Sequence, residues 1–259
     1  MLRPRIIPCL LVHNRGLVKT TAFGAPKYVG DPINAVRIFN EKEVDELVVL
    51  DIDATRNNVE PDFKLIENLA AECRMPLCYG GGVRTVEQAV RILKLGVEKV
   101  AFSAAAIDSP ELLPQVAGHI GVQSVVVVLD VKRNAKTGVH EVWTHNATRN
   151  TGRNVVEVAT SVRDLGVGEI TINSIDNDGA MKGYDLPLVR SVRAVTAMPM
   201  TVLGGAGSLN DIKALFDEFG VIGAAAGSLF VFKGTYRAVL INYPRREQKR
   251  ALWHAPVGS

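Results

Sequence analysis

The sequence predicts an α/β protein that folds as one (β/α)8 barrel. Eight short apolar runs alternate with longer amphipathic segments, as strands and helices do in a barrel of parallel strands. The chain has 259 residues, close to the length of about 250 that such a barrel uses. The second half also repeats the first, since Gly81 and Gly205 lie in similar turns and Glu46 and Glu169 start similar runs. Two fused (βα)4 halves would give this repeat and close into eight strands.

The predicted strands are short apolar runs, most clearly Val125-Val126-Val127-Val128-Leu129. Continuous apolar runs are typical of strands that are buried on both faces, as in a barrel surrounded by helices. In chain order the predicted strands are Arg5–Val12, Glu46–Ile52, Pro76–Tyr79, Lys99–Phe102, Ser124–Val131, Glu169–Asn173, Met198–Leu203 and Ile222–Ala226.

Helical periodicity and end signals place the helices between these strands. Asp31-Pro32 is a typical helix start, and Gly96 and Gly166 follow the third and fifth helical segments. The fourth segment overlaps Asp108-Ser109-Pro110, so its helix is predicted to start at Ser109. The seven predicted segments are Ile33–Lys42, Lys64–Ala71, Val86–Leu95, Ala105–Ala117, Val155–Leu165, Leu186–Thr196 and Leu209–Glu218.

No linker or shift in composition divides the chain, so we expect residues 1–259 to form a single domain. The tail 243–259 is basic and apolar by turns, and we expect it to fray or to pack on the outside of the barrel.

Composition limits the class of function. Apolar residues make up 47% and charged residues 22%, the balance of an ordinary globular protein. The formal charge of +3 does not predict nucleic-acid binding, and no apolar run approaches the roughly 20 residues that span a bilayer. Cys9, Cys73 and Cys78 lack metal-site spacing and indicate free thiols in a reducing cytosol. We therefore expect a cytoplasmic protein without metal, cofactor, nucleic acid or membrane.

Three glycine-containing turns follow predicted strands and precede helices or helix-like segments. They are Gly80-Gly81-Gly82, Gly204-Gly205-Ala206-Gly207 and Ala226-Gly227-Ser228. Such turns in a barrel lie at the catalytic face, where glycine lets the backbone approach an anion closely. They predict two phosphate sites on opposite sides of the barrel mouth, although a single turn of this kind is as often only a tight connection. Asp178-Gly179 would add to the second site or form a simple turn.

Carboxylates at the carboxyl ends of strands are the candidates for acid–base chemistry: Asp51, Asp130, Asp176 and Asp178. Asp130 directly follows the longest apolar run and is the strongest candidate, unless it only pairs with Lys132. By the internal repeat, Leu11 occupies the position in the first half that corresponds to Asp130. Because leucine cannot transfer a proton, a mechanism with two carboxylates across the mouth is not available.

The opposite ends of four strands carry charges: Arg5, Glu46, Lys99 and Glu169. Strand starts lie at the bottom of a barrel, so these two bases and two acids are able to form a closed ring of ion pairs. The ring would close and stabilise the barrel, or it would also gate the passage of a small neutral molecule.

Several longer motifs carry a family resemblance. They include Ile6-Ile7-Pro8-Cys9-Leu10, Gly30-Asp31-Pro32, Val127-Val128-Leu129-Asp130-Val131-Lys132-Arg133, Asn150-Thr151-Gly152 and Ser174-Ile175-Asp176-Asn177-Asp178-Gly179. Over roughly residues 3 to 235 the chain resembles the cyclase subunit of imidazole glycerol phosphate synthase. The resemblance implies a barrel of the ribulose-phosphate-binding type that docks a glutaminase at its bottom face. Ammonia would pass through the barrel to a bisphosphate substrate at the top.

The same resemblance assigns roles to single residues. It implies an ammonia gate at Arg5, Glu46, Lys99 and Glu169, a glutaminase interface at Glu98 and Gln123, a substrate loop with Lys19 and Asp51, and a catalytic Asp130. It implies phosphate binding by Gly82, Ser103, Asp178, Gly179, Gly205, Gly227 and Ser228. The chain departs from the family pattern at the top of the barrel, at Leu11, Ser103-Ala104, Asn173 and Leu203.

Two further segments, 26–36 and 39–47, resemble the branch of this family that is associated with acetamidino modification of surface-polysaccharide sugars. That branch implies an ammonia-conducting subunit of a lyase-like amidotransferase complex, whose own cyclase chemistry is lost. A third amidotransferase protein would use the ammonia to amidate a nucleotide sugar. Two alternatives remain: a working cyclase of histidine biosynthesis that relies on Asp130, and another phosphate-binding barrel such as the related sugar isomerase.

Overall fold

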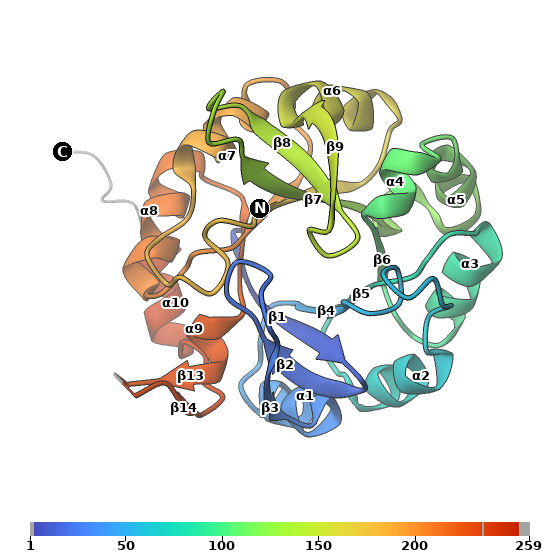
Figure 1. The fold of residues 1–259 in the computed structure, drawn as a ribbon. Coiled ribbons are helices and arrows are strands. Elements are labelled where there is room, and N and C mark those ends of the chain that lie inside the picture. The colour runs from blue at the N-terminus through green and yellow to red at the C-terminus, as the bar shows by residue number, and fades with distance from the viewer. Residues whose placement is uncertain (1–2, 235, 254–259) are drawn as a thin grey trace.

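The computed structural model describes residues 3–234 and 236–253, and it confirms the predicted (β/α)8 barrel (Figure 1). Each barrel strand pairs in parallel with its neighbours, and the last strand closes on the first. In order around the barrel the strands are β1 (Arg5–His13), β4 (Leu47–Asp51), β5 (Leu77–Gly80), β6 (Lys99–Phe102), β7 (Val125–Arg133), β10 (Glu169–Ser174), β11 (Met200–Leu203) and β12 (Gly223–Ala226).

Helices surround the barrel and cover the outer face of the strands (Figure 1). They are α1 (Pro32–Glu41), α2 (Phe63–Glu72), α3 (Val86–Lys94), α5 (Leu112–Ile120), α6 (Val155–Asp164), α7 (Leu186–Arg193) and α8 (Leu209–Phe219). Most begin at a side chain that accepts a backbone N–H of the first turn, as Asp31, Thr85 and Ser208 do. Such caps satisfy N–H groups that have no partner within the helix.

The segment after β6 corrects one prediction. Instead of one helix that starts at Ser109, the chain forms α4 (Ala104–Asp108) and then α5. Ser109 separates them with φ −144° and ψ 66°, since the residue before a proline is disfavoured in the helical region. The consequence for the site is that α4 begins directly after Ser103, at the carboxyl end of β6.

Two antiparallel hairpins at the barrel rim were not predicted as strands. β1 continues into β2 (Gly16–Lys19) and β3 (Lys27–Gly30), and β7 continues into β8 (His140–Thr144) and β9 (Arg149–Asn154). Both β1 and β7 have nine residues, longer than the other barrel strands, so their ends extend beyond the barrel edge. The hairpins occupy equivalent places in the two halves and flank the barrel mouth (Figure 1).

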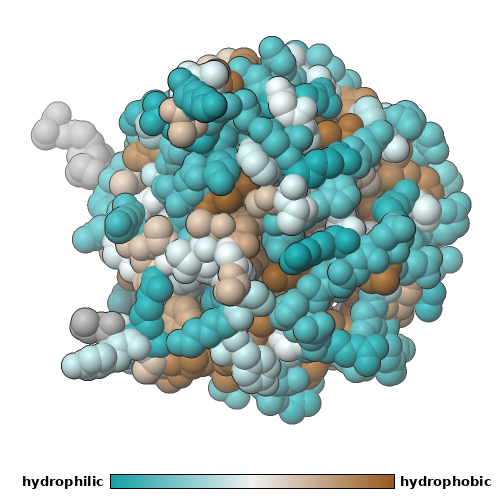
Figure 2. Space-filling model, in the orientation of Figure 1, coloured by the Kyte–Doolittle hydropathy of each residue, from teal (hydrophilic) through white to brown (hydrophobic). Residues whose placement is uncertain are grey.

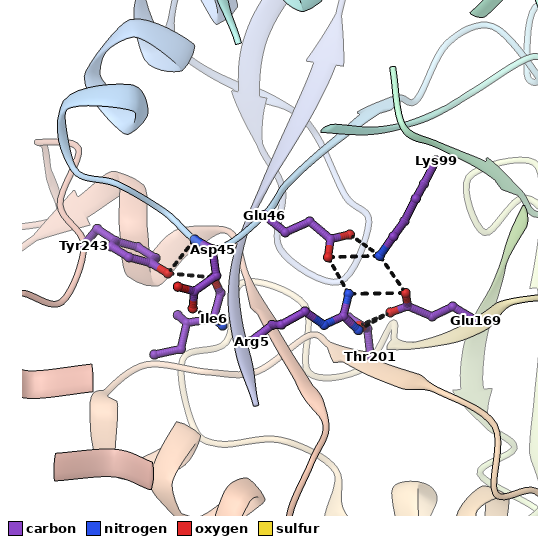
Figure 3. Close-up of polar contacts among 8 residues, drawn as sticks. All are labelled: Arg5, Ile6, Asp45, Glu46, Lys99, Glu169, Thr201 and Tyr243. Atoms are coloured by element: carbon purple, nitrogen blue, oxygen red, sulfur yellow. Dashed lines mark hydrogen bonds and ion pairs between the residues drawn. The ribbon is translucent and has the colours of Figure 1, made fainter. Parts of the chain in front are cut away.

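The C-terminal segment packs back onto the barrel. The segment comprises α9 (Ser228–Val231), β13 (Phe232–Lys233), β14 (Ala238–Val239) and α10 (Arg246–Trp253), and α10 contacts α8. A short 3-10 helix, η1 (Val122–Ser124), lies elsewhere, just before β7. The Tyr243 hydroxyl donates to the Ile6 carbonyl at 2.8 Å and accepts the Asp45 N–H at 3.2 Å. Lys249 reaches the Asp45 carboxylate at 2.7 Å (Figure 3 shows the Tyr243 contacts). Residues 254–259 of the predicted tail lie outside the described residues. Among the described residues, no helix is long and apolar enough to cross a membrane.

Replacing Tyr243 with phenylalanine is expected to lower the free energy of unfolding by about 1–2 kcal/mol, because one hydroxyl serves two backbone groups at the strand starts. Urea unfolding of the two proteins would measure this loss. Tyr236→Phe is the matched control, since Tyr236 is 97% exposed. Equal stability of the two variants would contradict the structural role of the Tyr243 hydroxyl.

Candidate functional site

The inside of the barrel is built in layers along its axis. Successive residues of a strand face opposite sides, so every second side chain of a barrel strand points inward. On β1 the outward residues Ile6 and Leu10 belong to the core beneath the helices, whereas Ile7 and Cys9 belong to a separate inner cluster. The layers therefore follow from the alternation that each strand imposes.

The bottom layer contains a closed ring of four charged side chains, Arg5, Glu46, Lys99 and Glu169, which we call the charge ring (Figure 3). Arg5 pairs with Glu46 and lies 2.7 Å from Glu169, and Lys99 lies 2.9 Å from each carboxylate. Acids and bases alternate around the barrel axis, as the positions of these residues at the strand starts predicted.

Burial and pairing act in opposite directions on the charge ring. Burial alone would raise the pKa of Glu169, but the adjacent Arg5 and Lys99 lower it to about 2. Burial alone would lower the pKa of Lys99, but the two carboxylates raise it. Glu169 and Lys99 are therefore charged at neutral pH, and each of the two carboxylates contacts two cations. Thr201 adds a neutral hydrogen bond to Glu169 at 2.5 Å.

The middle layers are mostly apolar. Two inner clusters contain Ile7, Cys9, Cys78, Ala101, Val126, Val128, Leu203 and Ala225, with Val48, Leu50 and Leu11 packed against them. Burial raises the pKa of the Cys9 thiol to about 11 and that of the Cys78 thiol well above its usual value, so both are neutral. The barrel interior between the charge ring and the mouth is therefore lined mainly by uncharged side chains.

The top layer opens into a cavity at the barrel mouth, on the face shown in Figure 2. The structure brings most of the predicted substrate residues together there: Leu11, Lys19, Asp51, Gly82, Ser103, Asp130, Asp178, Gly227 and Ser228 line it. In Figure 2 hydrophobic residues lie near the centre of this face and hydrophilic residues surround them.

Two predicted glycines, Gly179 and Gly205, do not line this cavity. Both have positive φ, which favours glycine. A Cβ at Gly179 would lie 2.2 Å from the Thr20 carbonyl oxygen, and one at Gly205 would lie 2.0 Å from that of Gly183. These glycines let neighbouring loops pack closely, and the second glycine-rich turn therefore supports the loops at the mouth.

Asp130 lies between Ser103 and Asn173 in the top layer. Asn173 Nδ2 donates to Asp130 Oδ1 at 2.8 Å, and the Ser103 hydroxyl lies 3.4 Å from Oδ2. Burial raises the pKa of Asp130 to about 7, against the opposing effect of these two hydrogen bonds. A carboxyl group with this pKa is able to give or take a proton near neutral pH. Leu11 lines the same cavity but has no titratable group.

The β2–β3 hairpin is folded over the mouth. Thr20 donates to the Asp178 carboxylate at 2.6 Å, and the Ala22 N–H donates to the Asp178 carbonyl at 2.9 Å. Lys19 is buried and donates to the Cys9 carbonyl at 2.6 Å, beside Gly227. Burial lowers the pKa of Lys19, although Asp178 acts against this. The sequence singled out Lys19 and Asp178, but not Thr20, which joins them.

The predicted docking residues lie at the opposite end from the mouth. Glu98 is exposed and directly precedes Lys99 of the charge ring, and Gln123 is exposed in η1 just before β7. Both therefore flank the starts of barrel strands, on the face where the charge ring lies.

Fold and site together define a class: a (β/α)8 barrel with a charge ring across one end and, at the other, a cavity lined by polar and apolar side chains. The family described as "Histidine biosynthesis protein" matches residues 5–237, and the chain belongs to this family.

The relatives that match most of the chain carry two kinds of name, one with the word "putative" and one without it. The chain is 55% identical over 254 residues to "Putative imidazole glycerol phosphate synthase subunit HisF" of Leptospira interrogans, covering 98% of this chain and 100% of that protein. It is 52% identical over 244 residues to "Putative imidazole glycerol phosphate synthase subunit hisF2" of Pseudomonas aeruginosa, covering 94% and 97%. It is 40% identical over 230 residues to "Imidazole glycerol phosphate synthase subunit HisF" of Lactococcus lactis subsp. cremoris, covering 89% of each chain. The chain is thus a HisF-like protein.

Proposed function

We propose that the whole chain, as one domain, is the barrel subunit of a glutamine amidotransferase complex. A glutaminase subunit binds the face that carries the charge ring and releases ammonia there. Ammonia passes along the barrel and leaves at the mouth. A third protein uses it to amidate a nucleotide sugar in surface-polysaccharide synthesis, and the barrel itself no longer performs the cyclase reaction.

The observation that carries this proposal is the contrast between the two ends of the barrel. The four members of the charge ring are all present and all paired, and an apolar lining follows them. A ring of paired charges blocks water and ions, and displacement of one side chain would open a path for a neutral molecule. At the mouth, by contrast, Leu11 replaces one of the two carboxylates that the family's cyclase reaction uses.

The names of the relatives support the part of the proposal that makes the chain a HisF-like subunit. Those with 52% and 55% identity carry numbered or qualified names, whereas the relative at 40% carries the plain name of the synthase subunit. The alternative is a working cyclase in which Asp130 acts without a second carboxylate. The pKa of Asp130, near 7, is the observation that favours this alternative.

Reversing the charge at Glu98 tests the glutaminase interface. Glu98→Arg is expected to weaken binding of the glutaminase subunit by roughly tenfold or more, because it reverses a charge at the proposed docking face. Titration calorimetry with the purified glutaminase measures the affinity, and glutamine hydrolysis by the complex reports activation. Glu157→Arg, at an exposed position of α6, is the matched control. Absence of binding by the unaltered barrel, or an equal affinity of both variants, would refute the proposal.

A further inference from the structure

Asn173 has a buried amide oxygen without a partner. The residue is 4% exposed, lies at the carboxyl end of β10 and lines the mouth cavity. Within the described residues its Oδ1 accepts no hydrogen bond. A buried polar atom without a partner costs about 1–3 kcal/mol, so its persistence calls for a donor that completes it.

The orientation of this amide is fixed by its neighbour. The register of β10 and β7 places Asn173 directly beside Asp130, and Nδ2 donates to the Asp130 carboxylate. In its ionised state Asp130 only accepts hydrogen bonds, so in that state the NH2 group faces it and the amide oxygen faces away. Turning the amide over would set two acceptors against each other. The free Oδ1 is therefore a consequence of the Asp130 contact.

Two adjacent acceptor groups, the Asp130 carboxylate and the Asn173 amide oxygen, are thus able to accept further hydrogen bonds. Asp130 keeps acceptor capacity, because a carboxylate has about four lone-pair positions and its Oδ2 has only the 3.4 Å contact with Ser103. Asn173 adds its free Oδ1. Of the basic side chains that line the cavity in the described part of the chain, Lys19 donates to the Cys9 carbonyl, Arg84 pairs with the Asn58 amide oxygen, and His145 contacts the Thr144 hydroxyl.

The surroundings restrict the donor to a small one. Leu203 is the register neighbour of Asn173 on β11, and Leu11 and Leu50 line the same cavity. These side chains belong to or pack against the inner apolar clusters, directly below the mouth. A compact group with several N–H donors and a positive charge fits a carboxylate and an amide oxygen under apolar walls. A bare metal ion would require more oxygen ligands than this pair offers.

We propose that Asp130 and Asn173 form a binding site for the ammonium ion at the inner edge of the barrel mouth. One N–H donates to the Asp130 carboxylate and another to Asn173 Oδ1, and the charge is balanced by Asp130. The existence of the site follows from the geometry of the two side chains. Its role as the place where conducted ammonia is held before transfer rests on the proposed function: arriving ammonia takes the proton of the Asp130 carboxyl group to give the ammonium–carboxylate pair, and it returns that proton to Asp130 when it leaves.

The test uses the isolated full-length barrel and 15N-labelled ammonium chloride. Binding broadens the 15N line of ammonium in a saturable way, and the concentration dependence gives an affinity. Asn173→Leu and Asp130→Asn are each expected to weaken that affinity roughly tenfold or more, since each removes a hydrogen bond to a charged group. Asp53→Asn is the matched control, because Asp53 lies at the rim, pairs with His13 and does not line the cavity.

Two competitor cations, potassium and tetramethylammonium, test the specificity of the site, and circular dichroism tests whether each variant is folded. Tetramethylammonium has no N–H donor and is expected not to compete, and potassium is expected to compete more weakly than ammonium. Asn173→Thr, a smaller change, replaces Asn173→Leu if circular dichroism shows that the latter is unfolded. Binding that survives both substitutions at position 173, or that tetramethylammonium abolishes, would overturn the site. Absence of saturable broadening would show that the amide oxygen binds only water.

The result is separable from the fate of the proposed function. Neither the ammonium titration nor its variants involve the glutaminase. If the barrel binds ammonium specifically but binds no glutaminase, the ammonium site is supported and the proposed delivery of ammonia by a glutaminase is refuted. If the barrel binds the glutaminase but not ammonium, the proposed function is supported and the ammonium site is refuted.

Discussion

Replacing Glu169 with glutamine is expected to destabilise the protein by about 3–5 kcal/mol, the cost of breaking a buried ion pair by removing one partner. Glu169 is 5% exposed and accepts from Arg5, Lys99 and Thr201. Its neutralisation leaves two partly buried cations facing only Glu46. Urea unfolding at pH 7 measures the loss. Glu98→Gln is the matched control, because Glu98 is exposed beside the ring.

The same variant has a signature in pH. The pKa of Glu169 is about 2 in the folded protein and 4.5 as its ordinary value. A depressed pKa contributes stability that is complete above the ordinary value and is lost as the pH falls through the folded value. The stability difference between the unaltered protein and Glu169→Gln should therefore shrink as the pH falls below about 4.5 toward 2. A constant difference over that range, or a loss at pH 7 no larger than that of Glu98→Gln, would contradict the closed ring.

The charge ring shows which part of a site a sequence is able to reveal. Its four members stand at the first positions of apolar runs, and parallel strands bring their starts to one end of a barrel by necessity. The alternation of each strand then settles which residues face inward. Fold, strand positions and ring were predictable for this reason, because each depends on local pattern and on one closure rule.

The residues that escaped prediction depend on contacts between distant loops. Tyr243 binds the starts of β1 and β4 from the C-terminal segment, and Thr20 joins the first hairpin to the loop that follows β10. Neither contact has a periodicity or motif. The phosphate-binding role predicted for Gly205 stays a prediction, because close packing of two backbones and close approach to an anion demand the same residue. Only the surroundings separate these two uses of glycine.

Asn173 combines both situations. The sequence singled it out as a departure from the family pattern. The free amide oxygen was not predictable, because it follows from a hydrogen bond to Asp130 across two neighbouring strands. At the mouth Leu11 therefore offers no carboxylate, and Asn173 places an amide beside Asp130.

With ammonium supplied directly, the unaltered barrel is expected not to convert the bisphosphate substrate of imidazole glycerol phosphate synthase. Ammonium in solution bypasses both the glutaminase and the charge ring, so the assay reports only on the mouth. Loss of one general acid–base group costs about 10²–10⁴ in rate, and Leu11 supplies none. Product formation is followed by chromatography over many hours. Turnover at a rate typical of enzymes that Asp130→Asn abolishes would restore the alternative, a working cyclase.

Leu11→Asp separates a missing group from a changed pocket. We expect this variant to remain inactive, because Ser103, Asn173 and Leu203 also depart from the family pattern around the cavity. β1 and β7 lie on opposite sides of the barrel, so the new carboxylate would face Asp130 across the mouth. Activity gained only on Leu11→Asp would show that the mouth still binds the bisphosphate and that one proton-transfer group alone was lost. Continued inactivity of a folded variant would place the difference in substrate contacts, as a barrel that passes ammonia to another acceptor requires.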